Sequence, residues 1–213
     1  MKLIMENWRR FLTEGIDPRI QKILDMMESP GGTKVAQYIR RTEKGKAITF
    51  EYRRVTDDER GVGNLVIERE PSHEGECSGG WHIASSVAEK GWGPLLYEVA
   101  LEWASANAGG LTSDRRQVSD QAASVWDKYL QRFPDAAQLD IDNTRDSWKG
   151  IKQLTPDDPS DDCEQDSAWR DMSDKLGGEF TDDSWQESPL SKLYKKDNTE
   201  VIDYLKSKEL WKE

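Results

Sequence analysis

The chain has 213 residues, of which 30 are Lys or Arg and 41 are Asp or Glu, giving a formal net charge of −11. This length suits one domain, or one domain with appended segments. We expect no direct nucleic-acid binding, because neutralising phosphates requires clustered Lys and Arg. We also expect no membrane segment, because no apolar run approaches the roughly 20 residues needed to span a bilayer.

The chain contains two cysteines and two histidines. These numbers exclude a disulfide-dense scaffold, a four-cysteine zinc site and a His-rich metal centre, so we expect no metal. A reducing compartment is the simplest interpretation, and the sequence leaves open one disulfide between Cys77 and Cys163. Nine tryptophans indicate a packed core with polar additions, because each can bury a large apolar surface.

Residues 1–14 form a predicted amphipathic leader, whose apolar side chains recur at helical spacing. Charged residues interrupt the apolar stripe and no small-residue cleavage site follows, so the leader is not a secretory signal. One interpretation is an N-terminal helix that packs on the domain.

The leader also resembles the capsid-targeting peptides of tailed bacteriophages. Those peptides direct proteins into the prohead, where a protease cuts after a Leu/Ile-x-Glu triplet. In this chain the triplet would be Leu12-Thr13-Glu14, with cleavage between Glu14 and Gly15. The resemblance implies a phage protein in the virion interior, the host cytoplasm or both, with the prohead protease and the capsid scaffold as partners.

The next segments are predicted from their periodicity. Asp17 and Pro18 begin a helix, as its cap and first helical position, and Pro30 ends it. Residues 34–41 fit either a strand or a helix.

Three strands follow. The period of two predicts an antiparallel hairpin of strands at 47–53 and 62–67, with Gly63 as a bulge. A third strand is expected at 81–87, after a polar loop.

A Gly-x-Gly turn follows the third strand and opens a helix. The turn is Gly91-Trp92-Gly93, and Pro94 is tolerated in the first helical turn, where its missing N–H has no intrahelical partner. Glycines let backbone N–H groups approach a phosphate, the helix N-terminus carries partial positive charge, and Lys90 would add a point charge. The turn therefore predicts an anion site, the alternative being a tight connection without a ligand.

A short strand at 111–113 and a second helix complete this region. Ser119 is the expected cap of that helix, which Pro134 ends. Its expected inward residues are Ala122, Ala123, Trp126 and Leu130.

This order of elements over Ile48 to Arg132 resembles the Gcn5-related N-acetyltransferase fold. The resemblance implies an α+β (mixed α/β) fold with a central, mainly antiparallel, splayed sheet flanked by helices. Residues 15–150 would form the acyl-CoA-binding core, and acetyl-CoA would be the co-substrate. Val87 and nearby backbone would hold the pantetheine arm, and the pyrophosphate would lie on Lys90, Gly91, Trp92, Gly93 and Pro94.

The same resemblance implies transfer of an acetyl group to an amine, either a protein or a small molecule. The stretch at 111–115 and the segments at 188–196 and 201–205 also resemble acetyltransferase-like phage proteins. The alternatives are a virion or internal head protein that keeps the fold without catalysis, and a module that binds a host protein.

Three positions depart from the family pattern. Ala88 stands where the family's turn usually has Arg or Gln, and Ser119 stands where the family often has Asn, although Ala122 matches. Trp126 stands where the family's tyrosine protonates the leaving thiolate. An indole has no comparable acidic proton, so Tyr97 and Tyr129 are the candidate substitutes.

Acetyl transfer to an amine needs a base. The candidates are Glu68 and Glu70 on one strand face, His82 in the strand nearest the thioester, and Asp114. We select His82, Asp114 and Tyr129 as catalytic candidates, and Asp114 with Arg115 for substrate binding. Each also has a structural interpretation: a solvated strand edge for the glutamates, a strand hydrogen bond for His82, and a turn ion pair for Asp114 and Arg115.

The last third of the chain is acidic. Residues 151–187 are expected to be an acidic, loop-rich insertion, whose carboxylates lack the regular spacing of a calcium loop. Residues 188–213 are expected to pack back on the core, with a final helix capped by Asn198. Its apolar face would comprise Val201, Ile202, Leu205 and Leu210.

Overall fold

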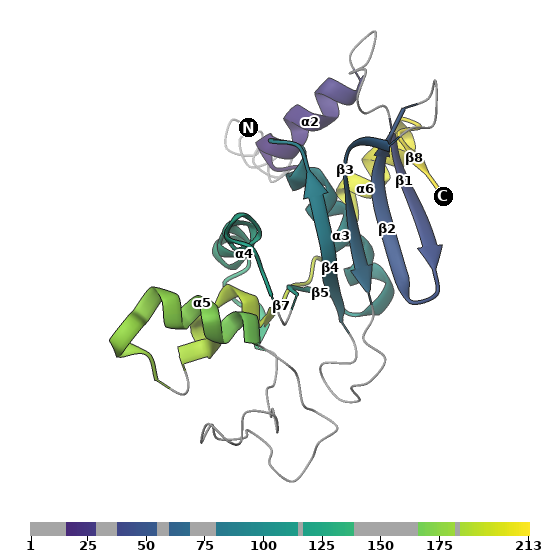
Figure 1. The fold of residues 1–213 in the computed structure, drawn as a ribbon. Helices are drawn as coiled ribbons and strands as arrows, with labels where there is room; N and C mark the ends of the chain where they lie inside the picture. Colours follow the sequence, from purple (N-terminus) through teal and green to yellow (C-terminus); the bar gives the residue numbers. More distant parts are fainter. Residues whose placement is uncertain are drawn as a thin grey trace, which may run out of the picture.

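The computed structural model describes residues 16–28, 38–54, 60–68, 80–114, 117–138, 166–181 and 184–213. The predicted leader, its cleavage site and residues 151–165 of the expected acidic insertion lie outside these residues. The described fold is mixed α+β: a six-stranded sheet in the order β5-β4-β3-β2-β1-β8, flanked by helices (Figure 1).

The sheet is mainly antiparallel. Its four main strands are β1 (Tyr38–Lys44), β2 (Ala47–Arg53), β3 (Arg60–Glu68) and β4 (Trp81–Ala88), each antiparallel to the next. Two short strands flank them in parallel: β5 (Leu111–Thr112) beside β4, and β8 (Trp211–Lys212) beside β1. The predicted strands at 47–53, 62–67, 81–87 and 111–113 are confirmed, and the ambiguous segment becomes a strand from Tyr38.

Helix α3 (Gly93–Ala108) is the centre of the hydrophobic core, because it packs against β2, β3, β4 and β5 and against two other helices. Those helices are α2 (Pro18–Glu28) and α6 (Glu200–Ser207). The apolar face of α3 is fully buried at Leu95, Leu96, Val99, Ala100, Leu101 and Ala104. This helix continues directly from the turn after β4, so the core fixes the position of that turn.

The remaining elements lie beyond the β5 edge of the sheet (Figure 1). Helices α4 (Asp120–Arg132) and α5 (Asp166–Leu176) lie there with β6 (Ala137–Gln138) and β7 (Lys192–Leu193), together with three short 3₁₀ helices at Gly177–Glu179, Ser184–Glu187 and Pro189–Ser191. Ser119 caps α4 as predicted, since its side chain accepts a hydrogen bond from the Ala122 N–H. The C-terminal part of the expected loop-rich segment is thus helical.

The β2–β3 register shifts between Glu51↔Asn64 and Arg53↔Arg60, so Gly63 lies in an irregular stretch of β3, where the bulge was expected. A second register shift leaves Ala84 unpaired, because the β3–β4 register steps from Val66↔Ser85 to Ile67↔Ile83. Gly63 also permits close approach of the strands, since a Cβ there would lie 2.6 Å from the Val87 carbonyl oxygen.

The N-cap position of the final helix is Thr199 rather than Asn198, and the Thr199 side chain makes no capping hydrogen bond. Leu210 lies beyond this helix and not on its face, because Glu209 takes a positive φ of 58° and turns the chain into β8.

A buried charge cluster joins α3 to α4 and to the C-terminal segment. Glu98 and Glu102 of α3 are 2% and 0% exposed. Arg132 of α4 donates two hydrogen bonds to Glu98, at 2.6 and 2.9 Å, and Lys196 bonds both carboxylates. Glu102 also accepts the backbone N–H groups of Val201 and Ile202 at the start of α6.

These contacts oppose the effect of burial on the two carboxyl groups. Burial acts to raise the pKa of Glu98, but Arg132 and Lys196 outweigh it and the pKa lies below its usual value. Burial keeps the pKa of Glu102 above its usual value despite Lys196 and the α6 amides.

We predict that Glu102→Ala lowers the free energy of unfolding by about 3–5 kcal/mol, because it removes one of the two buried carboxylates that Lys196 bonds and leaves the N–H groups of Val201 and Ile202 without their acceptor. Urea denaturation measures the change. Glu200→Ala, at an exposed glutamate of α6, is the control and should change stability by less than about 0.5 kcal/mol. Equal effects of the two substitutions would contradict the structural role of Glu102.

No helix in the described part of the chain is both long enough and apolar enough to cross a membrane.

Candidate functional site

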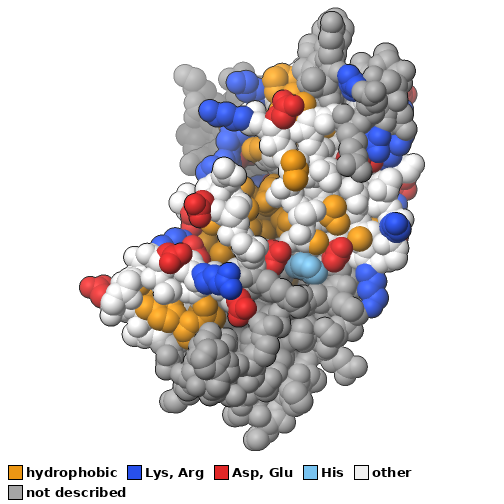
Figure 2. Space-filling model, in the orientation of Figure 1, with side chains coloured by type: hydrophobic (Ala, Val, Ile, Leu, Met, Phe, Trp, Pro, Cys, Tyr) orange, Lys and Arg blue, Asp and Glu red, His pale blue; other side chains and the backbone are white. Residues whose placement is uncertain are grey.

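A cleft opens between β4 and α4 because β5 stops after two residues. β4 pairs with β5 only at Trp81↔Leu111 and His82↔Thr112, so β5 does not cover the rest of this β4 edge. Two cavities of about 750 and 140 Å³ adjoin there and share Ser86, Tyr97, Ser119 and Ala122. Figure 2 shows hydrophobic side chains gathered in a hollow on this face of the molecule.

The turn at the end of β4 is anchored from beneath. The Glu89 N–H donates to the Val62 carbonyl at 2.8 Å, and the Trp92 N–H donates to the Glu89 carbonyl at 3.0 Å. The Trp92 ring packs edge-on against Tyr52, whose hydroxyl donates to the Trp92 carbonyl at 2.8 Å. Trp92 is therefore a packing residue that holds the turn in place.

The described residues leave the upper surface of the turn uncovered. Gly91 has a φ of +94°, and a Cβ built there meets no described atom within 4 Å. Of the described residues, a Cβ on Gly93 would meet Ala88 alone, at 3.9 Å. Gly91 takes a left-handed conformation that other residues adopt at a cost.

Helix α3 begins at this turn with no side-chain cap and no acidic residue in its first turn. The first N–H groups of a helix lack intrahelical partners and carry partial positive charge. Lys90 and Lys128 line the larger cavity with one carboxylate, Glu89. In a chain of net charge −11, this end of the cleft is locally basic.

Tyr97 and Ser86 form the middle of the cleft. Their hydroxyl groups are hydrogen-bonded at 3.0 Å, and both residues line both cavities. Burial raises the pKa of Tyr97, although the Ser86 hydrogen bond opposes it, so the phenol stays protonated at neutral pH. This pair offers hydrogen bonds to a ligand lying along β4.

The structure brings most of the predicted anion-site residues together. Lys90, Gly91, Gly93 and Pro94 line the larger cavity. The exceptions are Trp92, which packs beneath the turn, and Val87, which is 69% exposed and lines neither cavity.

Asp114 lines the smaller cavity, where it accepts a hydrogen bond from the Gln117 N–H at 3.1 Å. Arg115 and Glu70 lie outside the described residues.

His82 and Tyr129 lie elsewhere. His82 pairs with Glu68 of β3 and Thr112 of β5 and lines neither cavity of the cleft. Tyr129 lines a neighbouring cavity of about 390 Å³, and its buried hydroxyl has no hydrogen-bond partner among the described residues. Burial raises the pKa of Tyr129 well above its ordinary value.

Sequence reasoning missed Ser86 and Lys128 and could not place Tyr97. The signal for Tyr97 was present: it follows Gly93 by four residues, about one helical turn, so it lies on the same side of α3 as the turn. Lys128 carried no signal, because an exposed helical lysine is common.

No group of three or more His, Cys, Asp or Glu residues within the described ranges is placed to hold a metal ion. Comparison of the chain with protein-family models, curated proteins and solved structures found no match.

We predict that Gly91→Ala destabilises the protein by about 1–2 kcal/mol, because its φ of +94° strains any L side chain even where space is free. Thermal unfolding followed by circular dichroism measures this. Gly178→Ala is the matched control, since Gly178 also has open space around it but no positive φ. A Gly91→Ala protein as stable as the Gly178→Ala protein would show that the turn has another conformation.

Proposed function

We propose that this chain is an acetyltransferase-like protein that binds acetyl-CoA in the β4–α4 cleft and transfers its acetyl group to an amine. The observation that carries the proposal is the end of the β4–β5 pairing beside an uncapped α3 N-terminus. Among the described residues, no strand pairs with β4 beyond His82 on the β5 side and no side chain caps α3, so the strand edge and the helix N-terminus form one continuous binding surface.

Each part of that surface suits one part of the coenzyme. The pyrophosphate would lie on the backbone N–H groups at Gly91 and Gly93, with Lys90 and Lys128 supplying positive charge. The amide-containing pantetheine arm would run along the free edge of β4 past Ser86 and Tyr97. The thioester would then reach the smaller cavity.

Asp114 is the one carboxylate among the described residues that line the smaller cavity. The acceptor nitrogen attacks the thioester carbonyl carbon, the C–S bond breaks, and the nitrogen loses a proton while the thiolate gains one. We assign Asp114 to holding or deprotonating the acceptor amine. An acidic surface favours the approach of a cationic acceptor.

A non-catalytic role for the same fold is the second candidate. Trp126 stands at the position expected to protonate the thiolate, lines the smaller cavity and stacks on Tyr194 with ring centroids 5.4 Å apart, and its indole supplies no acidic proton. The protein would then bind the coenzyme, or a host protein, without transfer. The phage-head setting is proposed from the leader sequence alone.

Calorimetric titration of the full chain with acetyl-CoA tests the proposal. We expect micromolar binding that Gly93→Glu abolishes, because the new carboxylate would occupy the anion site. Gly93→Ala should keep binding, since its Cβ fits without a close contact. Gly178→Glu, with the same charge change in open space on the described surface, should also keep it.

Absence of binding by the folded wild-type chain would contradict the proposal, and so would equal binding by Gly93→Glu. If binding is found, radiolabelled acetyl transfer to polyamines and lysine peptides separates an enzyme from a coenzyme-binding protein.

A further inference from the structure

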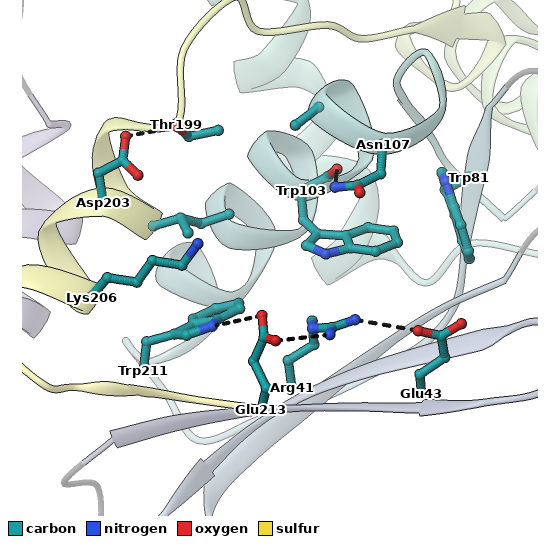
Figure 3. Close-up of a pocket in the computed structure, with 12 residues that line it drawn as sticks. Arg41, Glu43, Trp81, Trp103, Asn107, Thr199, Asp203, Lys206, Trp211 and Glu213 are labelled. Atoms are coloured by element: carbon teal, nitrogen blue, oxygen red, sulfur yellow. Dashed lines mark hydrogen bonds and ion pairs between the residues drawn. The ribbon is translucent and has the colours of Figure 1, made fainter.

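A further cavity lies at the opposite end of α3 from the glycine turn. It has a volume of about 440 Å³ and lies among α3, α6, β1, β4 and β8 (Figure 3). Three indoles from separate elements surround it: Trp81 of β4, Trp103 of α3 and Trp211 of β8. We call it the tryptophan pocket.

The charged groups of the tryptophan pocket largely satisfy one another. Arg41 lies between Glu43 and Glu213, with N···O distances of 3.4 Å to each, and its guanidinium is 5.9 Å from the Trp103 ring centroid. The Asp203 carboxylate accepts the Thr199 hydroxyl at 2.8 Å. An aromatic pocket with carboxylates would normally attract a cationic ligand. Here the Arg41 guanidinium already occupies that role.

What remains unsatisfied are hydrogen-bond donors. Within the described part of the chain, the indole N–H of Trp81 and the Nε–H of Arg41 are buried and have no hydrogen-bond partner. Trp81 is 8% exposed, so water does not replace a partner readily. A buried donor without an acceptor is rare, because it costs free energy of folding. A ligand that offers acceptor atoms would recover this free energy if small shifts of the two side chains bring the donors to it.

The tryptophan pocket is also lined by polar and charged side chains. The Asn107 amide nitrogen donates to the Trp103 carbonyl at 2.8 Å, which leaves its side-chain oxygen as an acceptor. The charged lining residues are Arg41, Lys206, Glu43, Asp203 and Glu213, two cations against three carboxylates. This near balance favours a neutral ligand over a phosphorylated one.

We propose that the tryptophan pocket binds a neutral, planar heteroaromatic ring of nucleobase size, such as a purine nucleoside. The indoles provide stacking faces, as aromatic side chains do for bases. Ring nitrogens accept hydrogen bonds from the unpartnered donors, and an exocyclic amine donates to Asn107. This site is independent of the proposed acetyl-CoA cleft.

Calorimetric titration of the full chain with adenosine tests the inference. We expect binding that Trp211→Leu weakens about tenfold or more, through loss of a stacking face. Trp169→Leu is the matched control: Trp169 is a partly buried tryptophan of α5 that packs on Phe180, and it does not line the pocket. Its affinity should equal that of the wild type.

A second measurement does not depend on how the variants fold. In a ¹H–¹⁵N spectrum of the wild-type chain, adenosine should shift the indole N–H resonance of Trp81. The Gly93→Glu variant should bind adenosine with wild-type affinity. This result would distinguish the tryptophan pocket from the cleft, even if the cleft does not bind acetyl-CoA.

The inference would be overturned if the wild-type chain did not bind adenosine. It would also be overturned if Trp211→Leu left adenosine binding intact or if Gly93→Glu removed it. Tighter binding of choline or adenosine monophosphate than of adenosine would contradict it as well. Choline would indicate a cation cage, and the monophosphate an anion site.

Discussion

The buried charge cluster on α3 is the constraint on which the rest of the structure depends. Glu98 and Glu102 are carboxylates within the core, and they are stable there only because Arg132, Lys196 and the α6 amides bond them. These partners come from α4 and from the C-terminal segment, far along the chain. The cluster therefore fixes α4, one wall of the cleft, against the helix whose N-terminus forms the floor.

The same helix lines both candidate ligand sites, the β4–α4 cleft and the tryptophan pocket. Its N-terminus opens into the cleft beside Gly91 and Gly93, and its C-terminal half contributes Trp103 and Asn107 to the tryptophan pocket. Core packing holds α3 rigidly between them. A single buried helix thus positions a basic, hydrogen-bonding site at one end and an aromatic site at the other.

Local signals in the sequence predicted most of the sheet, the turn and the cap of α4, because alternation, Gly-x-Gly and Ser119 act over a few residues. The charge cluster could not be predicted, since Glu98 and Glu102 resemble surface residues until Lys196, more than ninety positions away, is placed beside them. The Ala84 bulge is likewise a product of strand pairing. For the site, the turn residues were found, whereas Ser86 and Lys128 needed the fold to bring them into the cleft.

The most direct test of the account is a ¹H–¹⁵N spectrum of the full chain recorded with increasing coenzyme A. The account predicts that the backbone amides of Lys90, Gly91 and Gly93 shift first and most, followed by those of β4 near Ser86. Shifts that avoid the turn, or that cluster around Trp103 and Trp211, would contradict the assignment of the cleft as the coenzyme site.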